Sequence, residues 1–336
     1  MKVEKRKTSY HPLSIEVTRG DMVESLHQVD AAIVDWQGKL VKGWGDVDKI
    51  VYARSSLKPL QAIPLVESGA AAHYALEDKE IALACASHEG EDIHVETVAS
   101  WLQKIGCQEN DLACGIHAPY YPAAAEKLIR ENLKPSPMHN NCSGKHTGFL
   151  STARFYREPL KGYVDYSHPV QQRIVQVLEQ MTGVSLKQAP KGIDGCGIPV
   201  IGIPLFETAY AMARMANPTD LPPARQQAIK RIVQAIKKNP LMIGGHGRFC
   251  SILTEQLQER GFAKVGAEGV YIAVLPQKGL GIALKAADGA IRAAEMALVK
   301  ILLDLQILNE KDIEPLEKFI HPVIKNRAGL KVGEIR

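Results

Sequence analysis

A serine and a lysine three residues apart, Ser55 and Lys58, form the pattern in this chain that most suggests covalent chemistry. Residues at this spacing lie on the same face of a helix, so a helix that begins here would carry the serine at its N-terminus and the lysine one turn on. A serine hydroxyl needs a nearby base to act as a nucleophile at neutral pH, and a neutral lysine amine can supply one. Because so short a pattern also arises by chance, its weight depends on neighbouring segments.

Two further segments gather small and polar residues. The first, Cys85 to Glu91, follows an apolar run and fits either a helix end with a turn or the loop of a functional site. The second, Asn140 to Gly148, ends like a phosphate-binding P-loop but has His139 where the first glycine belongs, and two prolines stand where a strand should precede it. We therefore reject ATP binding, and expect the leading asparagines and serine of this segment to cap a helix.

Cysteine placement suggests thiols or metal ligands. In the segment Gly192 to Pro199, Cys196 stands between two glycines, which predicts a tight, exposed loop where a buried inert thiol fits poorly. Cys196 and Cys142 could share a metal ion, with Asp194 or His146 as further ligands, although the chain has no Cys-x-x-Cys pair to support this. The six cysteines are dispersed and follow no export signal, so we do not expect a disulfide framework.

Composition limits the classes of protein that the chain can represent. Its 336 residues are 46% hydrophobic and 23% charged, as in soluble globular proteins with an ample core. The net charge of +4 is small and spread among acids, which argues against a nucleic-acid partner. The chain contains no run of 18 apolar residues, so we expect no membrane span. The charged N-terminus is not followed by an apolar signal region. We expect a cytoplasmic protein.

Two β-hairpins near the ends of the chain frame a helical middle. Apolar, β-branched runs around glycine turns predict hairpins over 29–45 and 269–286, which can join into one antiparallel sheet with the first and last helices packed on it. Helical spacing of apolar residues predicts helices in between, and 326–333 is expected to fold back as a strand or loop. The expected helices cover 59–68, 93–105, 122–133, 145–156, 169–181, 205–216, 222–238, 251–259 and 290–308.

We thus expect an α/β fold of the α+β type, with a single catalytic domain over 1–336 built from two lobes. The sheet lobe would comprise about 20–70 and 262–336, and the helical lobe about 71–261.

Taken together and in one order, these segments resemble the L-asparaginase II family, the class 3 type first described in Rhizobium etli. The resemblance covers nearly the whole chain, and the combined match is far more specific than any single motif. The segments that carry it are 19–27, 53–59, 85–91, 141–148, 194–199, 247–250 and 264–269.

The resemblance implies a fold like that of serine β-lactamases and glutaminases and an active site of two Ser-Lys pairs. Here these would be Ser55 with Lys58 and Ser87 with Lys264. Two lysines in one pocket disfavour each other's charge, which would keep one amine neutral and able to act as a base. Activity should then rise above neutral pH. Without the resemblance, Lys264 would be taken for a surface lysine.

The resemblance also implies one zinc ion per chain, held by Cys142, Lys145 and Cys196, with Asp194 beside it. It does not imply a catalytic role for this ion. Arg54 and His88 flank the two serines, and we predict that they contact the substrate, with helix capping or packing as the alternative.

The expected function is that of a homodimeric L-asparaginase, which hydrolyses L-asparagine to L-aspartate and ammonia. Ser55 would attack the side-chain amide and Lys58 would accept its proton, although the sequence leaves open which serine is acylated. A glutaminase, a β-lactamase or a peptidoglycan peptidase on the same fold is the first alternative. The second is a zinc-dependent ligand-binding protein whose serines are inert.

Overall fold

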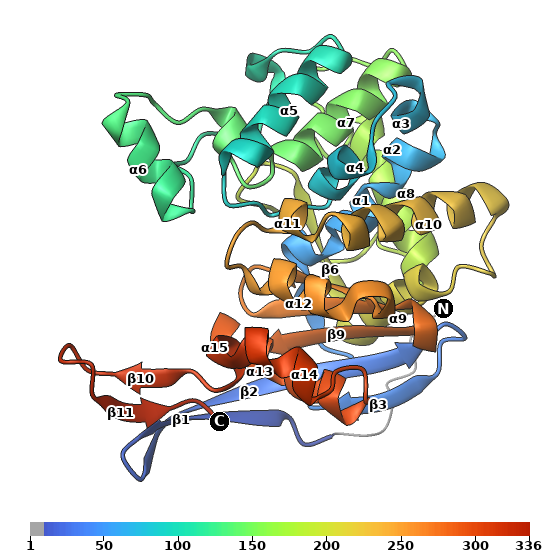
Figure 1. Ribbon diagram of the computed structural model, residues 1–336. Helices are drawn as coiled ribbons and strands as arrows, with labels where there is room; N and C mark the ends of the chain where they lie inside the picture. Colours follow the sequence, from blue (N-terminus) through green and yellow to red (C-terminus); the bar gives the residue numbers. More distant parts are fainter. Residues whose placement is uncertain (1–9) are drawn as a thin grey trace. The chain divides into compact units, whose positions relative to one another are not determined.

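The computed structural model describes residues 10–336, which divide into two compact units (Figure 1). The sheet unit comprises the described chain up to Ser56 together with 203–217 and 252–336, and the helical unit comprises 57–202 and 218–251. Compared with the predicted lobes, the helix at 205–216 belongs with the sheet, whereas the segment 57–70 belongs with the helices.

An antiparallel sheet forms the core of the sheet unit. Its strands run in the order β1-β2-β9-β8-β7, and β3 pairs with the second half of β2, at residues 31–34. The two predicted hairpins are present and join through β2 and β9, where Ala32 lies opposite Ala283. The prediction of one antiparallel sheet built from both ends of the chain is therefore confirmed. The strands are β1 (Leu13–Arg19), β2 (Met22–Asp35), β3 (Leu40–Trp44), β7 (Phe262–Gly266), β8 (Val270–Leu275) and β9 (Leu280–Ala286).

Helices cover both faces of this sheet. Side chains alternate between the faces of a strand, and every residue of β8 is buried, so both faces must be covered. The helices α9 (Leu205–Ala216) and α13 (Ile291–Asp304) each pack against β2, β8 and β9. At Gly281 a Cβ atom would lie 2.1 Å from the carbonyl oxygen of Ala209, so α9 rests directly on the strand backbone. The last predicted helix, α13, packs on the sheet as expected. The second helix on the sheet is α9, whereas the first predicted helix, 59–68, had been expected there.

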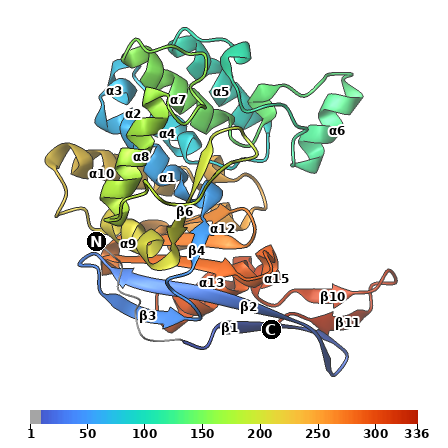
Figure 2. The same ribbon diagram turned by 180° about the vertical axis from the view of Figure 1, so that it is seen from behind.

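The C-terminal segment folds back beside the N-terminal strand. After α14 (Glu310–Ile313) and α15 (Glu317–Ile320), the strands β10 (Val323–Lys325) and β11 (Lys331–Glu334) form a hairpin next to β1 (Figure 2). This confirms that 326–333 folds back as a strand or loop. The sheet unit also contains the short strand β4 (Ile50–Tyr52).

The helical unit is organised around α7, of which residues 143–153 are all buried. Its predicted helices are present, with ends that shift by up to three residues. The helix bounds are α1 (Lys58–Gln61), α2 (Ile63–Glu67), α3 (Ala70–His73), α4 (Asp78–Ala84), α5 (Asp92–Lys104), α6 (Pro122–Arg130), α7 (Ser143–Phe155), α8 (Pro169–Thr182), α10 (Pro223–Lys238) and α11 (Pro240–Ile243). The strand β5 (Lys191–Ile193) pairs with β6 (Pro199–Pro204). Two elements, β6 and α12 (Phe249–Leu257), begin in the helical unit and end in the sheet unit.

One predicted helix is divided. The segment 59–68 forms α1 and α2, with Ala62 between them. Pro64 has no N–H to donate to the carbonyl of Leu60, so the hydrogen-bond ladder of α1 cannot continue through it. The sequence pattern did not predict this break, because Pro64 fits the apolar spacing.

All six cysteines are buried and free of disulfide bonds. The prediction was of thiols or metal ligands without a disulfide framework, and it did not include their burial. Among residues 10–336, no helix has the length and apolar character needed to cross a membrane.

Candidate active site

Lys58, the first residue of α1, is a buried lysine whose amine has three hydrogen-bond partners. It is 1% exposed. Its Nζ atom donates to Ser87 Oγ at 2.9 Å and to Cys142 Sγ at 3.1 Å, and it also bonds the carbonyl oxygen of Ala86. An ammonium has three donors, and all three have acceptors here. The amine is thereby fixed against one hydroxyl and one thiol.

Ser87 lies on the turn that follows α4. The helix ends at Cys85, and the Ser87 N–H donates to the carbonyl oxygen of Ile243 at 3.1 Å, which holds the turn against the end of α11. The residue is 8% exposed. A serine hydroxyl within hydrogen-bond reach of a buried lysine amine has the arrangement in which the amine, once neutral, accepts the hydroxyl proton.

The N-terminus of α7 carries a second cluster, made of Cys142, Lys145 and Cys196, all buried. Lys145 Nζ donates to Cys196 Sγ at 2.9 Å. The hydrogen bond from the Cys196 thiol, aided by the two nearby lysines, holds the pKa of Cys142 well below its usual value. Burial alone would lower the pKa of Lys145, but the neighbouring sulfur atoms of Cys142 and Cys196 outweigh it and raise that pKa.

This cluster fits the predicted zinc ligands. Two sulfur donors and one amine converge, and the Asp194 carboxylate lies close enough to contribute to the raised pKa of Lys145. Thiolates are preferred zinc ligands. Within residues 10–336 no group of three or more His, Cys, Asp and Glu side chains could hold a metal, so a site of this composition depends on the lysine.

The loop around Cys196 differs from its prediction. The glycines do form a tight turn, with Gly197 at φ +88°, but Cys196 is 4% exposed and its thiol points inward to Lys145. The expectation of an exposed thiol was wrong, because the sequence pattern describes the backbone turn and not the direction of the side chain.

The polar residues that were expected to cap α7 have another role. Cys142 occupies the N-cap position, and no side chain caps the helix. Asn140 Oδ1 accepts the N–H of Cys142 at 2.8 Å instead. The polar residues before α7 thus fix the backbone of a predicted zinc ligand.

The sheet unit holds the remaining predicted residues: Arg54, Ser55 and Lys264. Lys264 lies on β7 and is 1% exposed, so it is not the surface lysine that its local sequence suggests. A Cβ on Gly266 would lie 2.3 Å from the carbonyl oxygen of Ala53, and residues two apart share a face of a strand. The face of β7 that carries Lys264 is therefore the one that meets the chain just before Ser55.

Arg54 has a strained backbone. Its φ of +53° is left-handed, which few residues other than glycine adopt. Such strain costs of order 1–3 kcal/mol and is concentrated at functional sites. It occurs directly before Ser55, where the 3₁₀ turn Arg54–Leu57 begins.

His88 is fully buried, and both nitrogens of its ring have partners. Its Nδ1 accepts the N–H of Gly90 at 3.1 Å, so the proton resides on Nε2, which donates to Ser143 Oγ at 2.8 Å. The ring stacks on His94, and burial holds the pKa of His88 well below its usual value. These contacts favour the packing alternative for His88, with a neutral ring that joins segment 85–91 to the start of α7.

The structure therefore gathers Lys58, Ser87, Cys142, Lys145 and Cys196 in the helical unit. Ser55 and Lys264 belong to the sheet unit, whereas Lys58 and Ser87 belong to the helical unit, so the pairs Ser55–Lys58 and Ser87–Lys264 stay predictions.

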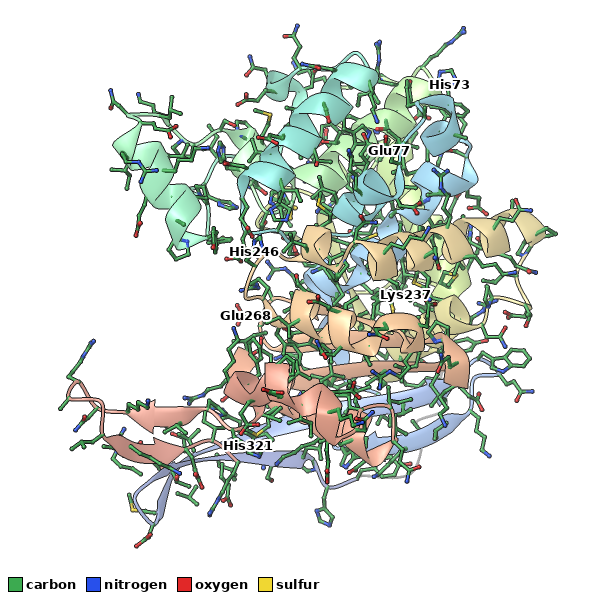
Figure 3. The ribbon with its side chains drawn as sticks, viewed as in Figure 1. His73, Glu77, Lys237, His246, Glu268 and His321 are labelled. Atoms are coloured by element: carbon green, nitrogen blue, oxygen red, sulfur yellow. The ribbon has the colours of Figure 1, made fainter. Side chains whose placement is uncertain are left out.

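A second set of charged residues lies near Ser87 along the chain, and no role for it was predicted from the sequence. Glu89 and Glu91 contact the loop 244–248, which carries His246, labelled in Figure 3, and Arg248. The available signal was the run of glycines that alternates with charged residues in this loop, which is typical of a tight functional turn.

A buried lysine amine against a serine hydroxyl is typical of hydrolases that act by acyl transfer. The family comparison is consistent with this class. The chain belongs to the L-asparaginase II family, whose model matches residues 15–336.

Several solved structures are similar in architecture at low sequence identity. Native Mglu is 14% identical over 85% of this chain and 67% of its own, with a TM-score of 0.48. A β-lactamase from Mycobacterium bovis is 14% identical over 83% of this chain and 95% of its own, with a TM-score of 0.41. In the first Mglu structure compared, which was determined in 4.3 M NaCl, the chain spans 63% of the neighbour's length. No curated protein matches the chain.

Proposed function

We propose that this protein is an L-asparaginase, which converts L-asparagine and water to L-aspartate and ammonia. The observation that carries the proposal is the buried amine of Lys58, 2.9 Å from Ser87 Oγ, in a chain of the L-asparaginase II family. The family directs the proposal to asparagine, and the serine–lysine contact provides a nucleophile and a base.

In the proposed reaction a serine hydroxyl attacks the carbon of the side-chain amide, and Lys58 accepts the hydroxyl proton. The C–N bond then breaks, and Lys58 returns the proton to the leaving nitrogen, which departs as ammonia. Water hydrolyses the resulting ester and releases L-aspartate. Backbone N–H groups near the serine would stabilise the oxyanion.

Either serine can be the nucleophile in this scheme. We assign the attack to Ser55, in the strained turn, and the tuning of Lys58 to Ser87 and Lys264. The bond from Lys58 to Ser87 also supports the reverse assignment. Mass spectrometry of the acyl-enzyme trapped in Ser55→Ala and Ser87→Ala decides between them, because only the variant that keeps the nucleophile gains the mass of the acyl group.

We propose that Cys142, Lys145 and Cys196 hold one zinc ion per chain. When bound, zinc would act as a Lewis acid that keeps both thiols and the amine deprotonated. Asp194 would orient groups beside the cluster. Cys142 also accepts a hydrogen bond from Lys58, so the same thiol helps to position the proposed base.

The test is ammonia release from L-asparagine and L-glutamine by the purified chain. We expect a kcat/KM for L-asparagine at least about tenfold higher, since one methylene is typically worth about 10–200-fold. Similar turnover of both amides would make the protein a glutaminase-asparaginase. Full loss of turnover in Ser55→Ala and Ser87→Ala, with zinc still bound, would exclude a ligand-binding protein with inert serines.

We also propose a cytoplasmic homodimer, on the family resemblance alone. Light scattering coupled to size-exclusion chromatography and fractionation of producing cells test these two points. A monomer, or activity outside the cytoplasm, would contradict them.

A further inference from the structure

An ion pair outside the Ser-Lys and cysteine clusters lies close to Ser87 along the chain. Glu89 Oε1 and Arg248 Nε are 3.3 Å apart, with side chains 10% and 43% exposed. Glu89 follows Ser87 by two residues, so their Cα atoms are at most about 7 Å apart. The pair therefore places one negative and one positive charge beside the short segment that carries a candidate nucleophile.

The surroundings fix the acidic member of the pair. Glu89 is mostly buried, and its carbonyl oxygen accepts the N–H of Tyr121 at 3.1 Å. The following residue, Gly90, has φ +76°, and a Cβ there would come within 3.1 Å of Pro119. The backbone at Glu89 is thus held from both sides, and its carboxylate contacts Arg248.

The neighbouring carboxylate holds the loop that carries the basic member. Glu91 accepts the backbone N–H of His246 at 2.8 Å and also bonds the His246 ring. At Gly245 a Cβ would lie 2.3 Å from Glu91 Oε1 and 3.0 Å from Glu89 Cγ, so this loop passes directly against both acidic side chains. Glu91 thereby has a structural task, whereas Glu89 contacts a partly exposed guanidinium.

The two charges match the head group of an α-amino acid. A buried carboxylate binds an ammonium, and a guanidinium binds a carboxylate, often through two parallel hydrogen bonds. An isolated buried carboxylate is costly, and burial raises the pKa of Glu89 although Arg248 opposes this. A ligand that offers its own ammonium to Glu89 and its own carboxylate to Arg248 would replace one ion pair with two.

We propose that Glu89 and Arg248 bind the α-ammonium and α-carboxylate groups of an amino acid ligand and so restrict the enzyme to free amino acids. This inference rests on the proposed function, because it assigns the head group of the same substrate. It adds the two residues that select the charged head group of that substrate.

The test is calorimetric binding of three ligands, which requires no turnover. L-Aspartate carries both head-group charges, succinate lacks the α-ammonium, and 3-aminopropanoate lacks the α-carboxylate. The variants are Glu89→Gln and Arg248→Gln. A third variant, Arg248→Lys, retains the positive charge but lacks the planar guanidinium that can donate two parallel hydrogen bonds. Asp92→Asn is the matched control, because it removes a nearby carboxylate that forms an ion pair with the exposed Lys127 and not with Arg248.

We expect the parent and Asp92→Asn to bind L-aspartate at least about tenfold more tightly than either analogue, because a hydrogen bond to a charged group typically contributes about this factor to affinity. Glu89→Gln should lose the preference over succinate while its affinity for succinate stays near that of the parent. Arg248→Gln should lose the preference over 3-aminopropanoate, and Arg248→Lys should recover only part of it. Thermal melting confirms that each variant is folded, and the Arg248 variants test the proposal even if Glu89→Gln is unstable.

The inference is overturned if the parent does not bind L-aspartate, or binds it no more tightly than succinate and 3-aminopropanoate. It is also overturned if both variants lose affinity for all three ligands equally, which is the result expected of a structural ion pair. These outcomes are separate from the fate of the proposed function. Hydrolysis of L-asparagine without head-group selection contradicts the inference alone. Selective binding of L-aspartate without hydrolysis of any amide contradicts the proposed function and supports the inference.

Discussion

At the scale of single residues, the proposed reaction depends on a lysine amine that the structure holds in one place. Lys58 has Ser87, Cys142 and Ala86 as acceptors, so its position is set from three directions. The sequence predicted the importance of Lys58 from its spacing to Ser55. It could not predict the contact with Ser87, which depends on how the turn after α4 packs.

We expect Lys58→Met to abolish most turnover, because it removes the proposed base while it retains an apolar chain of similar length. Ser87→Ala should reduce kcat strongly as well. Groups that act as one unit are not additive, so the double variant should be little worse than either single one. Steady-state kinetics with L-asparagine measure this, and losses that multiply would argue against a coupled pair.

The second prediction at this scale concerns metal and pH. Zinc must displace protons from its ligands, and the raised pKa of Lys145 means that this amine is protonated at neutral pH without the metal. Zinc affinity should therefore fall as pH falls, by about tenfold per pH unit for each proton displaced. Metal titrations between pH 6 and 8.5 check this, and an affinity independent of pH would contradict the ligand set.

Cysteine variants give a matched control for that site. Cys142→Ser and Cys196→Ser should each lose the bound zinc, as measured by elemental analysis of protein purified without a histidine tag. Cys107→Ser should retain it, because burial raises the pKa of Cys107 to about 11 and this thiol is outside the cluster. Equal zinc content in all three variants would rule out the site.

At the scale of secondary-structure elements, α7 positions both predicted zinc ligands of its first turn. Two glycines on α7 test its packing. A Cβ on Gly144 would lie 2.4 Å from the carbonyl oxygen of Leu83, whereas a Cβ on Gly148 would make ordinary contacts at 3.4 Å or more. Gly144 thus allows α7 to approach α4 closely.

We predict that Gly144→Ala lowers the free energy of unfolding by about 1–3 kcal/mol through overpacking. Gly148→Ala should be neutral or stabilise by up to about 1 kcal/mol, since alanine favours a helix more than glycine does. Chemical denaturation of both variants checks this. Equal effects would contradict the close approach of α7 and α4.

Sequence patterns predicted long elements better than short ones. Residues 205–216 form a helix with the predicted ends, because the apolar spacing and the flanking prolines and asparagine agree. The strand β7 was not predicted, since its residues Phe262–Gly266 include Lys264 and are too few to show alternation. The lysine is buried there by neighbouring elements, and only the family resemblance indicated that it was unusual.

At the scale of the whole molecule, the predicted site residues are divided between two units. All three predicted zinc ligands belong to the helical unit. Site residues of this kind are hard to predict from one sequence, because the partners are far apart in the chain. The contact of Lys58 with Cys142 joins residues separated by 84 positions, which no local pattern reveals.

Removal of the metal should affect the two units differently. We expect a chelator to raise amide hydrogen exchange in 140–148 and 192–199, where zinc would join two segments of the helical unit. The strands β8 and β9 should keep their protection, because they contain no ligand. Exchange measured by mass spectrometry with and without chelator tests this, and an equal change in both units would contradict a local structural role for the metal.

The most direct test of the central claim is ammonia release from L-asparagine by the purified chain, measured beside Lys58→Met. We predict steady release by the parent, with L-glutamine at least about tenfold poorer in kcat/KM, and loss of nearly all release in the variant. If the zinc-loaded parent releases no ammonia from L-asparagine, or if Lys58→Met releases it as fast as the parent, the assignment of an L-asparaginase with a Ser-Lys active site is wrong.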